Sequence, residues 1–234
     1  MNWVKLSKTI INIVSPILFL SAVWWLLNFP YALLAVMIFT AKNSTMVQTA
    51  VASGLLFMPI SAIPATVTTL ALARRYFKDG HHLPSWKTEL FYYRRDYLKS
   101  LIFGLINLSL LIIFYVSARY YARFFAFLAV IFIVLLVLLP FFFMILYSFL
   151  VDQQLSYRAY AANSFFMLVA HPVNSLLMMI DVAGTAFLLW VTFPPLLPIL
   201  FPGSCVLLVT HYFKKSLDKE ISKRADDTQQ IQTK

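Results

Sequence analysis

An acidic residue inside an apolar run is the strongest chemical signal in this 234-residue sequence. Asp181 lies within the run from residue 173 to 193. A carboxylate near the centre of a bilayer costs at least about 2.5–3.5 kcal/mol on translocon scales, so it must face protein or water, find partners or become protonated. Asn174, Thr185 and Thr192 lie on roughly the same helical face as Asp181. Gly184 beside them allows another helix to approach closely. We therefore predict a polar site on this segment.

Polar residues at the same depth on other apolar segments extend this site. Counted from the basic ends of their segments, Thr66 and Asn107 lie eight residues in, as Asp181 does, and Ser204 lies nine residues in. Eight residues of helix rise about 12 Å. One hypothesis is that these four residues line a single buried polar layer that binds a substrate or an ion. The alternative is that Ser, Thr and Asn are tolerated in helix–helix contacts and that the acid is merely hydrogen-bonded.

The sequence lacks the patterns of common catalytic and metal sites. It contains no Gly-x-Ser-x-Gly, no HExxH, no Walker A loop and no pair of intramembrane acids. Its four histidines have no Cys, Asp or Glu beside them at metal-ligand spacing, and the single Cys205 excludes a disulfide framework. We therefore predict that the protein is not an enzyme and holds neither a metal nor a cofactor.

The composition assigns these residues to a membrane protein. Hydrophobic residues make up 61% of the chain and charged residues 12%, with a mean hydropathy of +0.80, whereas a soluble domain carries about 25% charged residues. This excludes an ordinary cytosolic enzyme, a disordered protein and a nucleic-acid-binding domain. The net charge of +10 comes from basic residues confined to the gaps between apolar runs. The predicted fold class is an all-α polytopic membrane protein.

Six apolar runs meet or approach the length of about 20 residues that a transmembrane helix needs. They are residues 14–41, 47–73, 100–118, 124–150, 173–193 and 196–213. The last run is short and contains Pro198 and Pro202, so five spans and a re-entrant hairpin form the alternative. Apolar character persists from Ile10 to Ala41, which exceeds the signal-peptide core of about 7–15 residues, so we expect the first run to be retained.

The distribution of Lys and Arg predicts the orientation of the chain. With six spans, the N-terminus, the loops 74–99 and 151–172 and the C-terminal tail carry 16 of the 19 basic residues. By the positive-inside rule, we expect a multi-pass membrane protein with both termini cytoplasmic. We expect one transmembrane helical domain over residues 1–215 and a polar, largely disordered cytoplasmic tail over residues 216–234.

Two of the predicted cytoplasmic loops have amphipathic patterns. Over residues 83–97, apolar and aromatic residues recur at helical spacing while basic residues occupy the other faces, which is typical of a helix in the lipid headgroup layer. A second apolar stripe, over residues 152–169, consists of Leu155, Ala159, Ala162, Phe166 and Val169. We predict interfacial helices in both loops. The residues predicted to face lipid or a protein partner are Trp86, Arg94, Arg95 and Arg158.

Prolines interrupt several of the predicted spans. Pro59 and Pro64 lie inside the second run, and Pro172 directly precedes the fifth. A proline inside a helix removes a backbone hydrogen bond and frees a carbonyl. The broken helices either expose backbone to a ligand, as in many transporters, or are static kinks that shape the bundle.

The second apolar run and the loop after it resemble a known family. The segment FMPISAIPATVTTLALARRYFKDGHHLPSWKTELFYYRRDYLKS is similar to the YesL-like family of bacterial integral membrane proteins of unknown function. The residues that carry this likeness are Pro59, Pro64, Ala65, Thr66, Arg74, Arg75, Trp86 and Arg95. A later segment, YRAYAANSFFMLVAHPVNSLL, is similar to the family's Ala-rich helix, which closes with His171-Pro172. The likeness extends from about residue 10 to 215, but the long first run and Asn28-Phe29-Pro30 depart from the family pattern.

The resemblance implies a role in carbohydrate uptake in a bacterium, because the family's genes often lie beside carbohydrate ABC importers and glycoside hydrolases. Our first hypothesis is an accessory or scaffold protein in the bacterial plasma membrane that binds permease subunits of a carbohydrate (oligosaccharide) ABC importer. The alternative is a small stand-alone transporter or ion-coupled permease that uses the polar layer around Asp181. Neither hypothesis involves nucleic acid, and the sequence does not fix an oligomeric state.

Overall fold

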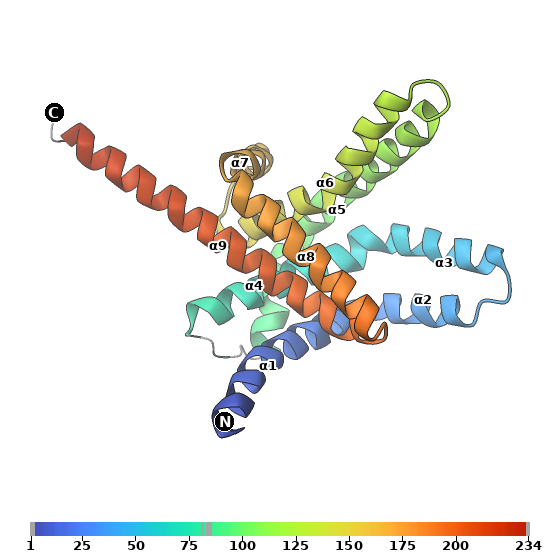
Figure 1. The fold of residues 1–234 in the computed structure, drawn as a ribbon, viewed down its shortest axis with the longest axis horizontal. Helices are drawn as coiled ribbons and strands as arrows, with labels where there is room; N and C mark the ends of the chain where they lie inside the picture. Colours follow the sequence, from blue (N-terminus) through green and yellow to red (C-terminus); the bar gives the residue numbers. More distant parts are fainter. Residues whose placement is uncertain (1–2, 81, 83–85, 233–234) are drawn as a thin grey trace.

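The computed structural model describes residues 3–80, 82 and 86–232, and the side chains of residues 14–80, 82, 87–88 and 90–223. This part of the chain is helical apart from short connections (Figure 1), which confirms the all-α prediction. The helices are α1 (Trp3–Leu27), α2 (Phe29–Phe39), α3 (Ser44–Phe57), the π-helical turn η1 (Met58–Ala62), α4 (Ile63–Lys78), α5 (Trp86–Tyr121), α6 (Ala126–Asp152), α7 (Tyr157–Ala170), α8 (Pro172–Thr192) and α9 (Leu196–Gln232).

The helices are long and apolar enough for a multi-pass membrane protein. Five described segments meet the length and hydropathy of a span: Ser44–Lys78, Leu90–Tyr121, Ala126–Asp152, Pro172–Thr192 and Leu196–Lys223. A sixth is possible if the bent pair Val14–Leu27 and Phe29–Phe39, which turns by 85°, forms one span. Five or six spans agree with the number expected from the sequence.

The interruption lies in the first predicted span and not in the last. Helix α9 continues through Pro198 and Pro202. Pro198 lies in the first turn, where a helix has no intrahelical N–H bond to lose. After Pro202, the N–H of Gly203 donates to Ser21 Oγ of α1 at 2.9 Å, so a neighbouring helix supports the backbone there. The first span is broken instead at Asn28, because Pro30 favours a new helix start and the Asn28 side chain accepts a hydrogen bond from Ser61 of η1.

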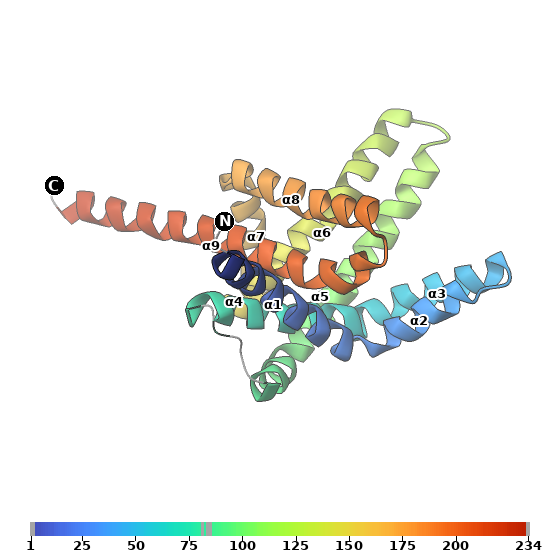
Figure 2. The same cartoon turned by 60° about the horizontal axis from the view of Figure 1, so that its bottom comes forward.

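The central part of the molecule is η1 and α4, which form one long apolar run with α3. Of the most apolar 18 residues of this run, 61% are buried, against 22% for α5 and for α6, 39% for α9 and 11% for α8. Leu72 and Ala73 of α4 are fully buried and belong to the same core cluster as Phe143 of α6 and Val209 of α9. The hairpins α2–α3 and α5–α6 diverge from this centre as two arms in both views (Figures 1 and 2). The chain is therefore a core of packed helices from which two hairpins project.

Two glycines lie at close helix contacts in the core. A Cβ atom at Gly104 of α5 would lie 2.8 Å from Pro59 Cα, and one at Gly203 of α9 would lie 2.1 Å from the carbonyl oxygen of Ile17 in α1. Both positions therefore require glycine. At Gly184, where the sequence predicts a close approach, a Cβ atom would have no described neighbour within 4 Å. That expectation is wrong because α8 packs through another face.

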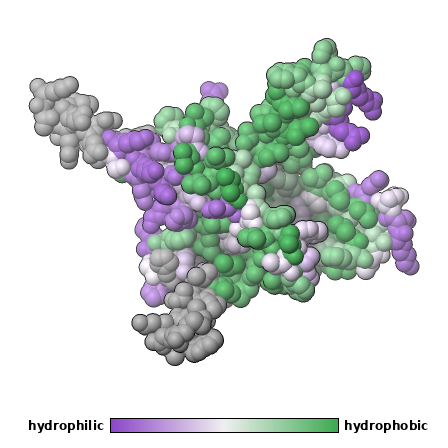
Figure 3. Space-filling model, in the orientation of Figure 1, coloured by the Kyte–Doolittle hydropathy of each residue, from purple (hydrophilic) through white to green (hydrophobic). Residues whose placement is uncertain are grey.

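A broad polar surface covers the ends of α4 and α9, and smaller polar patches lie at the tips of the two hairpin arms (Figure 3). Three contacts join the surrounding elements at this end. Arg74 forms an ion pair with Asp152, Asn174 Nδ2 donates to Ser216 Oγ at 3.0 Å, and Lys99 Nζ lies 5.8 Å from the centre of the Tyr160 ring. We call this region the basic end. Its parts are Arg74–Lys78 of α4, Lys87–Lys99 of α5, the end of α6, all of α7 and Lys214–Lys223 of α9.

The segment of the second amphipathic loop forms a helix of its own, whereas the described part of the first loop and the tail continue into longer helices. Residues 157–170 form the separate helix α7, whose N-cap Ser156 accepts from the Ala159 N–H at 3.4 Å. By contrast, residues from 86 onward belong to the unbroken helix α5 and do not form a helix of their own. Where the sequence predicts a largely disordered tail over residues 216–234, α9 remains helical to Gln232. Residues 216–232 contain neither Gly nor Pro to stop it.

Candidate functional site

The four residues of the predicted polar layer each have a partner of their own. Thr66 Oγ1 accepts from Trp24 Nε1 of α1 at 3.1 Å, and Asn107 Nδ2 donates to the Tyr147 hydroxyl of α6 at 3.2 Å. The half-buried Asp181 accepts from the Tyr212 hydroxyl of α9, whereas Ser204 donates to the Leu200 carbonyl of its own helix at 2.6 Å. Among the described side chains, no hydrogen bond joins two of the four. These contacts are of the kind that the helix-contact alternative expects, and the ligand-binding layer stays a prediction.

Asp181 belongs instead to a polar strip along the contact between α8 and α9. The antiparallel pairs are Asp181 with Tyr212, Asn174 with Ser216, and His171 with Glu220. In the last pair, His171 Nε2 lies 2.9 Å from Glu220 Oε1. On α9 the partners recur every four residues, at 212, 216 and 220, which places them on one helical face. The sequence predicts the shared face of Asp181 and Asn174, whereas these partners on α9 were not predicted. Their four-residue spacing was the available signal.

Of the two prolines in the second span, Pro59 lies in the π-helical turn η1 and Pro64 lies in the first turn of α4. The N–H of Ile63 donates to the Met58 carbonyl, five residues back, so the helix widens by one residue without breaking. Pro59 is buried against Gly104, and the Tyr97 hydroxyl donates to the Ile60 carbonyl at 3.4 Å. Protein groups thus pack against Pro59 and hydrogen-bond the Ile60 carbonyl, while the Ile60 side chain is 48% exposed. The geometry favours the static-kink interpretation of the prolines.

This double-proline span lies within a stretch that a known family shares. Residues 17–118 match the DUF624 family. The family is described as a protein of unknown function, and the match confirms the YesL-like resemblance over this stretch. No curated protein and no solved structure matches the chain.

The DUF624 segment divides the candidate residues into two groups. It begins in α1 and ends in α5, so it contains Thr66, Asn107 and the motif Pro59, Pro64 and Ala65, of which Ala65 is fully buried. Asp181, Ser204, α7 and Pro172, which begins α8, lie beyond it. The polar strip between α8 and α9 is therefore not part of the matched segment.

The predicted interface residues of the DUF624 segment differ in how firmly they are held. The Trp86 side chain lies outside the described residues. Arg95 donates through Nε and Nη2 to the Asp96 carboxylate at 2.9 and 2.6 Å and lies 4.9 Å from the Tyr92 ring centre. Arg94 is exposed, and it lines a surface depression together with Leu90, Phe91 and Arg95. Arg94 is therefore available to an outside partner, whereas Arg95 is tied to its neighbours.

Helix α7 turns an apolar face away from the core. Tyr160 is fully buried and its hydroxyl donates to the Gln153 carbonyl at 2.7 Å, which fixes the connection from α6. On the opposite side Phe165, Phe166 and Val169 are 54–62% exposed. The predicted stripe thus faces outward at Phe166 and Val169. The neighbouring Arg158 is exposed as well.

The described His, Cys, Asp and Glu side chains do not gather into a metal site. Within the described residues, no group of three or more His, Cys, Asp or Glu could hold a metal ion.

Proposed function

We propose that the protein is an accessory or scaffold membrane protein that binds a carbohydrate (oligosaccharide) ABC importer through its basic end. The observation that carries this proposal is the outward aromatic face of α7, formed by Phe165 and Phe166. Aromatic residues and Arg are enriched at protein interfaces, and the exposed Arg158 lies on the same helix. The gene neighbourhood implied by the YesL-like resemblance is the reason for naming a carbohydrate importer.

The first turns of α5 contribute a second part of the proposed surface. Leu90 and Phe91 are each 62% exposed beside Arg94. Lys99 of this segment lies over the Tyr160 ring of α7, so both parts belong to one end of the molecule. We propose that this end faces the cytoplasm of a bacterium, with both termini cytoplasmic, because it carries most of the basic residues. There α7 and the start of α5 would lie at the membrane surface.

Charge reversal at Arg94 tests the proposal. The tagged protein is purified in gentle detergent from native membranes, and co-purifying proteins are identified by mass spectrometry. We expect importer subunits in fixed ratio with the wild type and their loss with Arg94→Glu, because the exposed guanidinium contacts the partner. Arg95→Glu is unsuitable, since it would oppose the buried Asp96 carboxylate.

Arg119→Glu is the matched control. Arg119 is exposed near the other end of α5 and undergoes the same charge change. Importer subunits should remain with this variant. If the wild type purifies without importer subunits, or if Arg94→Glu retains them in the wild-type ratio, the proposed complex does not form through this surface. In that event the basic residues serve only to contact anionic lipid.

A stand-alone transporter remains the second proposal, and it depends on Asp181. The hydrogen bond from Tyr212 already gives this carboxylate a partner inside the protein, so the structure offers the transporter less support. Its test is pH-dependent flux in liposomes, which Asp181→Asn should abolish at normal expression.

A further inference from the structure

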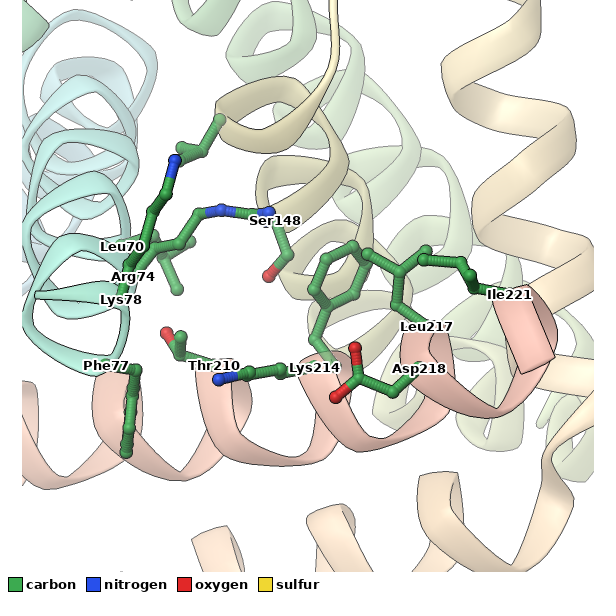
Figure 4. Close-up of a pocket in the computed structure, with 12 residues that line it drawn as sticks. Leu70, Arg74, Phe77, Lys78, Ser148, Thr210, Lys214, Leu217, Asp218 and Ile221 are labelled. Carbon is green, nitrogen blue, oxygen red and sulfur yellow. The ribbon is translucent and has the colours of Figure 1, made fainter. Parts of the chain in front are cut away.

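A cavity of about 270 Å³ lies at the basic end between α4, α6 and α9 (Figure 4). Its apolar walls include Leu70, Phe77, Phe213 and Leu217. Its polar lining consists of Arg74, Lys78, Lys214, Asp218, Ser148 and Thr210. The proposed partner surface on α7 and α5 makes no use of this cavity.

The charges in the cavity leave a small positive excess. Arg74 is already paired with Asp152, which is only 6% exposed. Among the described residues, no hydrogen bond or ion pair is assigned to Lys78 or Lys214. These two ammonium groups outnumber the single carboxylate of Asp218 by one. The cavity therefore matches a monoanion better than a dianion.

The two hydroxyl groups act as acceptors toward anything inside the cavity. Ser148 Oγ donates to the Met144 carbonyl at 2.9 Å, and Thr210 Oγ1 donates to the Val206 carbonyl at 2.7 Å. Each hydroxyl proton is thus engaged, while the lone pairs stay free. The ionised Asp218 is also an acceptor. A matching ligand combines a negative charge for the lysines with hydroxyl groups that can donate.

We propose that this cavity binds the headgroup of an anionic phospholipid that has a monoanionic phosphodiester and free hydroxyl groups. Lys78 and Lys214 hold the phosphate, and Ser148, Thr210 and Asp218 accept hydrogen bonds from the headgroup hydroxyls. The volume is just below the lower bound of about 300 Å³ for small-molecule pockets. It suits a headgroup whose acyl chains stay among the surrounding lipids. Basic pockets between transmembrane helices are known to take such headgroups.

The test measures lipid binding to the full-length protein in detergent by native mass spectrometry. Phosphatidylglycerol is the probe, with phosphatidylcholine, phosphatidic acid and inorganic phosphate as comparisons. We expect phosphatidylglycerol to bind more tightly than phosphatidylcholine. Lys214→Gln should weaken phosphatidylglycerol binding about tenfold, because it removes one charged hydrogen bond. Lys215→Gln is the matched control, since Lys215 is an exposed neighbour outside the cavity lining, and it should leave binding unchanged.

Asp218→Asn is a second variant, for which we expect tighter lipid binding. Misfolding cannot produce such an increase. At mildly alkaline pH, where phosphatidic acid is a dianion, this variant should bind phosphatidic acid more tightly than the wild type does. Equal weakening by Lys214→Gln and Lys215→Gln would overturn the site. Displacement of the lipid by inorganic phosphate would show a site for free phosphate, and wild-type binding of phosphatidic acid as tight as that of phosphatidylglycerol would contradict the charge argument.

Discussion

Two membrane segments of nearly equal hydropathy occupy opposite positions in this molecule. The α3–η1–α4 run and α8 have mean hydropathies of 1.8 and 1.7 over their most apolar 18 residues, yet 61% of the first window is buried and only 11% of the second. The most apolar span, α6 at 3.2, lies between them at 22%. Mean hydropathy therefore does not decide which helix is central.

The difference comes from the size and placement of the polar and small residues. In α4, Thr68 and Thr69 donate to carbonyls four residues back at 2.9 and 3.0 Å, so they enter the core without unpaired hydroxyls. Ala65 and Ala73 let neighbouring helices approach. In α8, Asn174 and Asp181 pair with α9 in the polar strip, and the other faces carry large exposed apolar residues such as Ile180 and Phe187. The central helix α4 therefore carries small side chains on several faces, and its hydroxyls form hydrogen bonds within the helix. The peripheral helix α8 forms its polar contacts with α9 along one face.

Matched glycine substitutions should give the largest difference in stability between the central run and α8. Gly104→Leu should destabilise the protein by about 3 kcal/mol or more, because the new side chain would collide with the Pro59 backbone of the central run. Gly184→Leu on α8 should change stability by less than about 0.5 kcal/mol, since no described atom lies within 4 Å of the added Cβ. Thermal unfolding in detergent measures both. Equal losses would mean that α8 is packed as closely as the centre.

Substitutions that weaken the contact between α8 and α9 should cause a smaller loss of stability. Asp181→Leu removes the acceptor of the Tyr212 hydroxyl and should cost about 1 kcal/mol, as intramembrane hydrogen bonds typically do. Asp181→Asn keeps an acceptor and should cost less. Denaturant unfolding in mixed micelles ranks the variants, with Tyr212→Phe as the partner control. A loss of several kcal/mol for Asp181→Asn would show that the strip between α8 and α9 is not peripheral.

Much of the fold follows from the sequence, because length and hydropathy locate spans directly. The six apolar runs correspond to the five spans and the bent pair α1–α2. The position of the helix break was mispredicted. Pro198 and Pro202 indicated a break in the last span, but the Ser21 hydroxyl supports Gly203 there, and it comes from a helix about 180 residues away in the sequence. The depth of Thr66 and Asn107 was also readable, but their neighbours were not, because residue spacing does not reveal the order of helices around α4.

The exposed face of α7 provides the most direct test of the proposed importer-binding role. A photoreactive phenylalanine analogue is placed at Phe166 of α7 or at Phe187 of α8, which are 54% and 65% exposed, and native membranes are irradiated before mass spectrometry. We expect cross-links to permease or ATPase subunits of a carbohydrate ABC importer from position 166 and none from position 187. Cross-links to those subunits from both positions alike, or from neither, would contradict the account.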